Sequence, residues 1–274
     1  MPSIDGETLT GVSATTLWTL RNRATEAERP DGAIDDAWAV RLFESIDYDW
    51  GKFGKHSQFH ALRAVTFDAV TTEYLLAHPK AAVVALAEGL QTSFWRLDDA
   101  GVADDVRWYS VDLAPVMALR EQLLPRTKRV VELAQSALDR SWMDRVDDRQ
   151  GVFITAEGLL MYLKPDEVRA LIEDCAARFR GGRMIFDSIP PWISRRTLQD
   201  QSVSNRYVVP SMPFGLSADD GVRLAHQIPG VHAARDIALQ PGRGPFKLMA
   251  WPPLDRIALL RRARRAITLL EFDN

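Results

Sequence analysis

Short apolar runs alternate with amphipathic stretches from about residue 80 to the end of the 274-residue chain. The first run, residues 81–87, is apolar on both faces, which is typical of a strand buried in a parallel sheet. Further strands are predicted at residues 106–112, 129–133, 151–155 and 183–188, with helices at 116–124 and 166–180 between them. This alternation predicts βαβ units and an α/β fold, with a doubly wound, mostly parallel sheet.

Three amphipathic segments precede the predicted sheet. Apolar residues at helical spacing predict helices at residues 14–28, 37–46 and 58–77, and the last of these ends before a proline. We interpret residues 1–79 as an N-terminal helical cover over one end of a ligand site. Residues 80–274 would then form a Rossmann-like core, and the whole chain a single structural domain.

The chain changes character after the fifth predicted strand. Residues 189–216 are rich in proline and aromatic residues, and they predict an irregular cap insertion near the pocket. Beyond it we expect a short helix at 217–227, a strand at 231–239, a helix at 254–266 and a closing strand at 267–272. The last helix is strongly basic, which we interpret as a solvated face. Its arginines are Arg256, Arg261, Arg262, Arg264 and Arg265.

Charge and composition exclude several classes of function. The net charge of −3 gives no electrostatic reason to expect a nucleic acid or an anionic membrane as a partner. No apolar run approaches the roughly 20 residues that cross a bilayer, and the N-terminus lacks the pattern of a secretory signal. The single Cys175 excludes an internal disulfide and a cysteine-based zinc site. We therefore expect a cytoplasmic protein without a metal.

Acidic and small residues stand at the carboxyl ends of the first two predicted strands. Ala87-Glu88-Gly89 ends the first, and Gly89 allows a sharp turn or close approach to a ligand. Asp112 ends the second, 24 positions after Glu88, where a carboxylate can accept hydrogen bonds from both hydroxyls of a ribose. Either feature could instead be structural, as a turn without a ligand or as the cap of the next helix.

Two similar motifs follow later strands. Ser136-Ala137 comes after the third strand, and Glu157-Gly158 comes directly after the fourth. Ligands of open α/β sheets bind in the crevice outside the carboxyl ends of the strands. We therefore expect these residues to face the same ligand site as Gly89 and Asp112.

Together these motifs resemble the leucine carboxyl methyltransferase family, a group of class I S-adenosylmethionine-dependent methyltransferases. The branch of tetracenomycin-type polyketide O-methyltransferases is the most similar in pattern. The resemblance runs from about Thr15 to Ser188 and is weaker beyond. It is carried by TLWTLRNRATEAERP, IDDAWAVRLFESIDYD, ALRAVTFDAV, VVALAEGLQTSFWRL, WYSVDLAPVMALREQLLP, SALDRSW and ITAEGLLMYL, in that order.

The resemblance implies S-adenosyl-L-methionine as the cofactor and assigns residues to it. Arg63 matches the family arginine that holds the methionine carboxylate, a task that suits the planar guanidinium. Without the family, Arg63 could equally be an exposed helix arginine. Glu157 would face the methionine amino group. The other implied cofactor residues are Ala87, Glu88 and Gly89 at the methionine part, Asp112 at the ribose, Leu113, Ser136 and Ala137 at the adenine, and Gly158 beside Glu157.

The sequence departs from the family pattern at four positions. The family turn is usually Leu-Gly-x-Gly-x-Asp-Thr-Arg, whereas here Ala87 replaces the first Gly, and Gln91 and Ser93 replace an Asp and an Arg. Ser136 stands where relatives carry an acid at the adenine. These changes put tight cofactor binding in doubt.

The cofactor implied by the resemblance carries an activated methyl group, so the protein must mainly orient an acceptor and exclude water. A carboxylate acceptor needs no base, whereas a phenol would benefit from one. The candidate bases or acceptor-binding groups are His60, Tyr162 and His56, although each could be purely structural. An aromatic acceptor could be enclosed by Trp18, Phe59, Trp192, Met212 and Phe214, or these could be core residues.

We therefore predict an O-methyltransferase that acts on a small organic acceptor, through a carboxylate, phenol or enol oxygen of polyketide-like type. A non-catalytic binding or scaffold protein with the same fold is one alternative, motivated by the altered turn. A nicotinamide-dependent oxidoreductase is another, since it shares the strand, turn and distal acid. Against the oxidoreductase, the GxGxxG motif is missing and Glu88 would bring a negative charge to a pyrophosphate.

Overall fold

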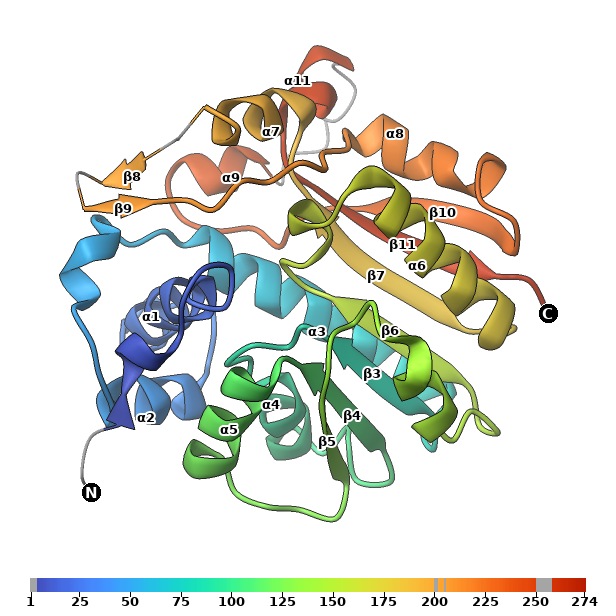
Figure 1. Cartoon of the computed structure of the whole chain (residues 1–274), viewed down its shortest axis with the longest axis horizontal. Helices are drawn as coiled ribbons and strands as arrows, with labels where there is room; N and C mark the ends of the chain where they lie inside the picture. The colour runs from blue at the N-terminus through green and yellow to red at the C-terminus, as the bar shows by residue number, and fades with distance from the viewer. Residues whose placement is uncertain (1–3, 200–201, 205, 250–257) are drawn as a thin grey trace.

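The computed structural model describes residues 4–199, 202–204, 206–249 and 258–274 (Figure 1). Within these residues the central sheet has seven strands in the order β10-β11-β7-β6-β3-β4-β5. The five strands β3 to β7 are parallel, and β11 and β10 add to β7 in antiparallel orientation. The strands are β3 (Ala82–Leu86), β4 (Arg107–Asp112), β5 (Val130–Ala134), β6 (Val152–Ala156), β7 (Arg183–Ser188), β10 (Val231–Ile237) and β11 (Ala266–Phe272). The predicted fold class is confirmed.

Helices cover both faces of the sheet, as the doubly wound prediction requires. Two pairs of short strands lie outside it, β1 (Ile4–Asp5) with β2 (Ile46–Asp47) and β8 (Ser202–Ser204) with β9 (Tyr207–Val208). The helices are α1 (Thr15–Ala27), α2 (Ala37–Ser45), α3 (Phe59–Ala77), α4 (Ser93–Asp99), α5 (Ala114–Leu123), α6 (Pro165–Arg178), α7 (Pro191–Thr197), α8 (Ala218–Arg223), α9 (Pro245–Met249) and α11 (Ala258–Ala263). Single 3-10 turns complete the chain at Gly6–Thr8, Trp50–Phe53, Arg140–Arg145, Leu160–Tyr162 and Leu224–His226.

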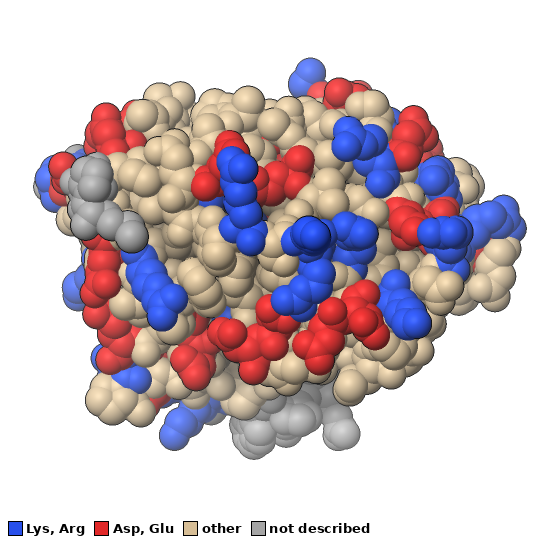
Figure 2. All heavy atoms as spheres, turned by 90° about the horizontal axis from the view of Figure 1, so that it is seen from below, with Lys and Arg blue, Asp and Glu red and all other residues tan. Residues whose placement is uncertain are grey.

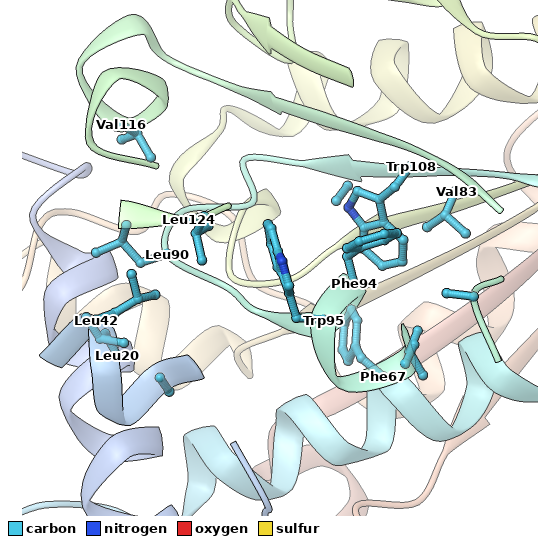
Figure 3. Close-up of a cluster of buried hydrophobic side chains, with 14 of the residues drawn as sticks. Leu20, Leu42, Phe67, Val83, Leu90, Phe94, Trp95, Trp108, Val116 and Leu124 are labelled. Atoms are coloured by element: carbon cyan, nitrogen blue, oxygen red, sulfur yellow. The ribbon is translucent and has the colours of Figure 1, made fainter. Parts of the chain in front are cut away.

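The period-two alternation of strand β3 divides the apolar core into two layers. Val83 and Ala85 pack with side chains of α1 to α5 on one face, whereas Val84 and Leu86 pack with side chains of α6 and the 3-10 turn after β5 on the other. Figure 3 shows part of the first layer, where Trp108 of β4 packs near Phe94 of α4. Strands β3 and β6 are therefore buried on both faces, as their continuous apolar runs predict, whereas the edge strands β5 and β10 are partly exposed.

The predicted N-terminal cover is joined to the sheet by shared core and by buried polar contacts. The cluster of Figure 3 combines Leu20 and Leu42 of α1 and α2 with residues that follow β3 and β4. Arg23 of α1 is fully buried, and its Nη2 donates to the carbonyl oxygen of Leu90, 2.7 Å away. One apolar cluster includes side chains from residues 1–79 and from the sheet. The boundary at residue 79 therefore stays a prediction from the sequence.

The insertion at 189–216 is more regular than predicted. It contains helix α7 and the β8–β9 pair, and its apolar side chains gather over the end of the sheet. Ile189, Val209 and Met212 form a small buried cluster with Met161. The segment was expected to be irregular because its prolines interrupt any period, but Pro191 stands in the first turn of α7, where proline is well tolerated.

The basic run near the C-terminus is not one solvated face. Residues 254–257 of the predicted helix, with Arg256, lie outside the described residues, and α11 ends at Ala263. Arg262 is exposed, in agreement with the prediction, and Arg261 is half-buried and pairs with Asp219. Arg265 lines the cavity described below, so the interpretation as a solvated face is wrong there.

The surface carries mixed charge. On the face shown in Figure 2, Lys and Arg side chains lie next to Asp and Glu side chains, without a broad basic surface. Within the described part of the chain, no helix combines the length and the hydropathy needed to span a bilayer.

Candidate functional site

A cavity of about 340 Å³ opens at the carboxyl ends of the parallel strands. From β3 the chain runs outward through β4 to β5, and it then crosses back to β6 on the other side of β3. The strand order therefore reverses at β3, and open α/β sheets bind ligands at such a switch point. Of the thirteen residues that the sequence singled out as cofactor-binding or catalytic, all but His56 line this one cavity. The twelve that line it are His60, Arg63, Ala87, Glu88, Gly89, Asp112, Leu113, Ser136, Ala137, Glu157, Gly158 and Tyr162.

The turn after β3 is left-handed at two positions and is held from both sides. Ala87 has φ 50° and Gly89 has φ +61°. A Cβ on Gly89 would lie 2.4 Å from Oγ1 of Thr16, so only glycine fits there. The same Thr16 hydroxyl accepts the N–H of Leu90 at 2.6 Å, and Arg120 donates to the carbonyl oxygens of Gly89 and Gln91. Residues far apart in the chain thus fix the shape of this turn.

We expect Ala87→Gly to raise the free energy of unfolding by about 1 kcal/mol, because a left-handed conformation costs an L-residue about that much and glycine nothing. Urea denaturation would measure the difference. The matched control is Ala85→Gly in the extended strand β3, which should lower stability. An Ala87→Gly protein less stable than the parent would contradict this account of the turn.

Glu88 faces the core rather than a ligand phosphate. Its Oε1 accepts the indole N–H of Trp108 at 3.1 Å, and its Oε2 lies 2.9 Å from Nη2 of Arg120. Burial raises the pKa of Glu88, and the Arg120 guanidinium opposes that rise. Glu88 also lines the cavity, but Arg120 compensates its charge, which weakens the argument that this charge would repel a pyrophosphate.

Asp112 anchors the turn and does not cap the following helix. Its Oδ2 accepts the N–H of Gly89 at 2.6 Å, and its Oδ1 accepts the N–H of Leu113 at 2.7 Å. Helix α5 begins after Leu113, which has no side-chain cap. Burial raises the pKa of Asp112, and the two backbone hydrogen bonds partly offset the rise. Each oxygen keeps a lone pair that can accept a hydroxyl from a bound ribose.

Asp112→Ala is expected to weaken binding of S-adenosylhomocysteine about ten-fold or more, a loss of about 1.4 kcal/mol or more. Calorimetric titration would measure it. Asp104→Ala, at an exposed position before β4, is the matched control and should bind like the parent. Unchanged affinity in Asp112→Ala would remove this carboxylate from the cofactor site.

Arg63 of α3 joins two strand ends. Its Nε donates to Oε1 of Glu157 at 2.9 Å, and its Nη1 donates to Oδ2 of Asp187 at 2.9 Å. Burial disfavours the charge, but Asp187 and Glu157 outweigh it and raise the pKa of Arg63 above its ordinary value. Burial raises the pKa of Glu157, and the charge of Arg63 opposes this.

This cluster fits the amino-acid end of the expected cofactor. Nη2 of Arg63 and Oε2 of Glu157 make no hydrogen bond to any part of the chain that the structure describes. A guanidinium N–H and a carboxylate oxygen side by side complement the carboxylate and ammonium of a methionine group. A Cβ on Gly158 would lie 3.3 Å from Nη1 of Arg63, which explains the small residue there.

The departures from the family turn are built into the site. The amide of Gln91 donates to Oε1 of Glu157, and the hydroxyl of Ser93 accepts from Nη2 of Arg96. At the other end of the cavity, Ser136 and Ala137 follow β5, and Leu113 is 46% exposed beside them. This end offers apolar contact and few charges, as a flat heteroaromatic ring would need.

The remaining wall forms a chamber beside Arg63. Tyr162 and His60 lie there with apolar side chains, but the acceptor pocket differs from the prediction. Burial raises the pKa of Tyr162, and Thr15 opposes this rise, so the phenol stays protonated at neutral pH. The apolar lining is Trp18, Met161, Ile189, Ile193, Val209 and Met212. Phe59, Trp192, Phe214 and His56, which were proposed for this pocket or its chemistry, do not line it.

Two functional candidates were missed in the sequence. Asp187 ends β7, and besides binding Arg63 it accepts the N–H of Gly158. An acid at the carboxyl end of a parallel strand is the same signal that singled out Asp112, so it could have been found. Arg265 was hidden inside a basic run. Within the described residues, no group of three or more His, Cys, Asp or Glu side chains forms a candidate metal site.

The fold is that of a class I methyltransferase, and the cavity at the strand ends is its candidate site for S-adenosyl-L-methionine. The family model described as leucine carboxyl methyltransferase matches residues 16–176, and the chain belongs to that family. The tetracenomycin polyketide synthesis O-methyltransferase TcmP of Streptomyces glaucescens is 31% identical over 231 residues, which cover 82% of this chain and 83% of TcmP. The S-adenosyl-L-methionine-dependent methyltransferase dpfgK of Gibberella zeae is 29% identical over 202 residues, 66% of this chain and 67% of dpfgK.

A solved structure from Thermobifida fusca shares the fold, with a TM-score of 0.56 and 14% identity over 94% of each chain. The protein is therefore an S-adenosyl-L-methionine-dependent methyltransferase. This replaces the alternatives of a nicotinamide-dependent oxidoreductase and of a non-catalytic scaffold. The altered turn that motivated the scaffold is a well-bonded part of the cavity.

Proposed function

We propose that the enzyme transfers the methyl group to an oxygen of a small organic acceptor of polyketide-like type. The observation that carries this proposal is the apolar chamber around Trp18 and Met212, which is continuous with the cofactor half of one cavity. A concave pocket with an apolar part suits a small molecule, whereas a nucleic acid would need a broad basic surface. The 31% identity to TcmP supports the polyketide-like acceptor. The single, buried Cys175 agrees with a cytoplasmic enzyme.

The bound cofactor would supply an activated methyl group on a sulfonium. The protein's own residues then bind and orient. Arg63 and Glu157 hold the amino-acid end, Asp112 fixes the ribose, and the insertion covers the acceptor and excludes water through Ile189 and Met212. Orientation and exclusion of water are the main contributions a protein makes to such a displacement.

A labelled methyl donor, offered with a panel of aromatic acids, phenols and enols, tests this proposal. We expect label in at least one compound, and alkaline hydrolysis then separates esters from ethers. A peptide ending in a free leucine carboxylate is included, because the panel must separate small molecules from protein C-termini. Transfer only to the peptide, or only to nitrogen or carbon, would contradict the proposal.

A further inference from the structure

Arg265 is a charged side chain in the cavity without an ion-pair partner among the described residues. It lies directly before β11, is half-buried, and lines the same cavity as Arg63 and Tyr162. Within the described part of the chain its guanidinium makes no hydrogen bond and no ion pair, although its backbone carbonyl oxygen accepts one from Nη1 of Arg264. Its guanidinium carbon lies 4.4 Å from the centre of the Phe59 ring, which orients the group without cancelling its charge.

The three arginines that are buried rather than half-buried are each paired with a carboxylate. Arg23 pairs with Asp36, Arg63 with Glu157 and Asp187, and Arg120 with Glu88. A partly buried cation without an anion is costly, and proteins normally compensate it. Burial and the nearby charge of Arg63 lower the pKa of Arg265, and the carboxylate of Asp187 opposes this only in part. An anion supplied by a ligand would complete the site.

A second donor lies on the same wall, because the tautomer of His60 is fixed by its neighbours. Oδ1 of Asn22 accepts the N–H of Ser57 at 2.9 Å, so the Asn22 amide must present its NH₂ group to Nδ1 of His60, 2.7 Å away. Burial, with the charges of Arg63 and Arg265, lowers the pKa of His60 well below its ordinary value. The imidazole is therefore neutral, accepts at Nδ1 and carries its proton on Nε2.

We propose that Arg265 and the Nε2–H of His60 together bind an anionic oxygen group of the acceptor. The guanidinium of Arg265 and the Nε2–H of His60 are both donors, and the nearby carboxylates of Glu157 and Asp187 form ion pairs with Arg63. His60 is then a hydrogen-bond donor rather than a base. The inference rests on the proposed function and narrows it: the enzyme selects acceptors that carry an acid group on an apolar body.

Calorimetry in saturating S-adenosylhomocysteine tests this with matched acid and amide pairs, namely benzoate with benzamide, salicylate with salicylamide and 2-naphthoate with 2-naphthamide. We expect at least one acid to bind about ten-fold or more tightly than its amide. Arg265→Gln should abolish the preference, and His60→Phe should reduce it, while both keep their affinity for S-adenosylhomocysteine. Arg262→Gln, on the exposed part of the same basic run, is the matched control and should retain the preference.

Two outcomes would overturn the assignment. One is a wild-type protein that binds S-adenosylhomocysteine but prefers no acid in the panel, whether or not the amides bind. The other is an Arg265→Gln protein that keeps the preference. Neither outcome would contradict the proposed O-methyl transfer, because that proposal is tested separately by methyl transfer to the compound panel.

Discussion

Replacement of Arg63 by methionine is expected to reduce the affinity for S-adenosylhomocysteine at least 100-fold, about 2.7 kcal/mol. The guanidinium is only 5% exposed and holds Glu157 and Asp187 at once, so its loss leaves two buried carboxylates without a counter-charge. It also removes the N–H group that would meet the methionine carboxylate. Calorimetry measures the affinity, and a thermal melt of the same sample establishes that the protein is folded.

Two variants frame this result. Arg63→Lys keeps the charge but not the planar fork, and should bind with intermediate affinity. Arg169→Met, at an exposed position on α6, removes an arginine that pairs with Glu173 and donates to the carbonyl oxygen of Gln227, away from the cavity, and should bind like the parent. If Arg63→Met is folded and binds normally, the assignment of the methionine end of the cavity is wrong.

Asp36→Asn is expected to lower the free energy of unfolding by about 3–5 kcal/mol, because it leaves a buried cation uncompensated. Asp36 is 1% exposed and accepts from Nε of Arg23 at 3.3 Å and from Nη1 of Arg96 at 2.7 Å. Arg96 keeps a second partner in Asp68, but Arg23 has no other carboxylate within salt-bridge distance in the described chain. Since Arg23 also binds the carbonyl oxygen of Leu90, the cofactor turn should loosen as well.

The effect depends on pH in a defined direction. Burial acts to raise the pKa of Asp36, but Arg96 and Arg23 outweigh it and lower the pKa below its ordinary value. A carboxyl group with a lowered pKa stabilises the fold above the unfolded-state pKa of about 3.9, and this contribution is lost as the pH falls. The gap between parent and variant should therefore be full at pH 7 and shrink below pH 4.

Urea denaturation at several pH values would measure this gap. Asp31→Asn is the matched control, since Asp31 is an exposed carboxylate with surface partners and should change stability by less than about 1 kcal/mol. A gap of the same small size for Asp36→Asn at pH 7 would show that the buried network contributes little.

The order of helices and strands could be predicted because it depends on local periodicity. Strand β3, for example, is apolar on both faces over its whole length, and the prediction misses its ends by a single residue. The insertion was harder, because α7 forms around prolines that break any regular pattern. Its placement over the cavity depends on contacts of Ile189 and Met212 with Met161, which are distant in sequence.

The site was predicted as a set of positions but not as a set of interactions. Residues at strand ends converge by topology, so Asp112 and Glu157 could be found from their places in the chain. Side-chain partners depend on tertiary packing. In the sequence Arg120 looks like an ordinary arginine of an amphipathic helix, yet in the structure it pairs with Glu88 and donates to the carbonyl oxygen of Gly89 in the turn after β3. Arg265 was concealed for a similar reason, since a basic run does not show which member turns inward.

Calorimetric titration of the unmodified protein with S-adenosylhomocysteine tests the central claim most directly. The account predicts a single site with micromolar affinity, because Arg63, Asp112 and Glu157 line one preformed cavity. Absence of binding at millimolar concentration, in a sample with a normal thermal transition, would contradict it. The cavity at the strand ends would then not be a cofactor site.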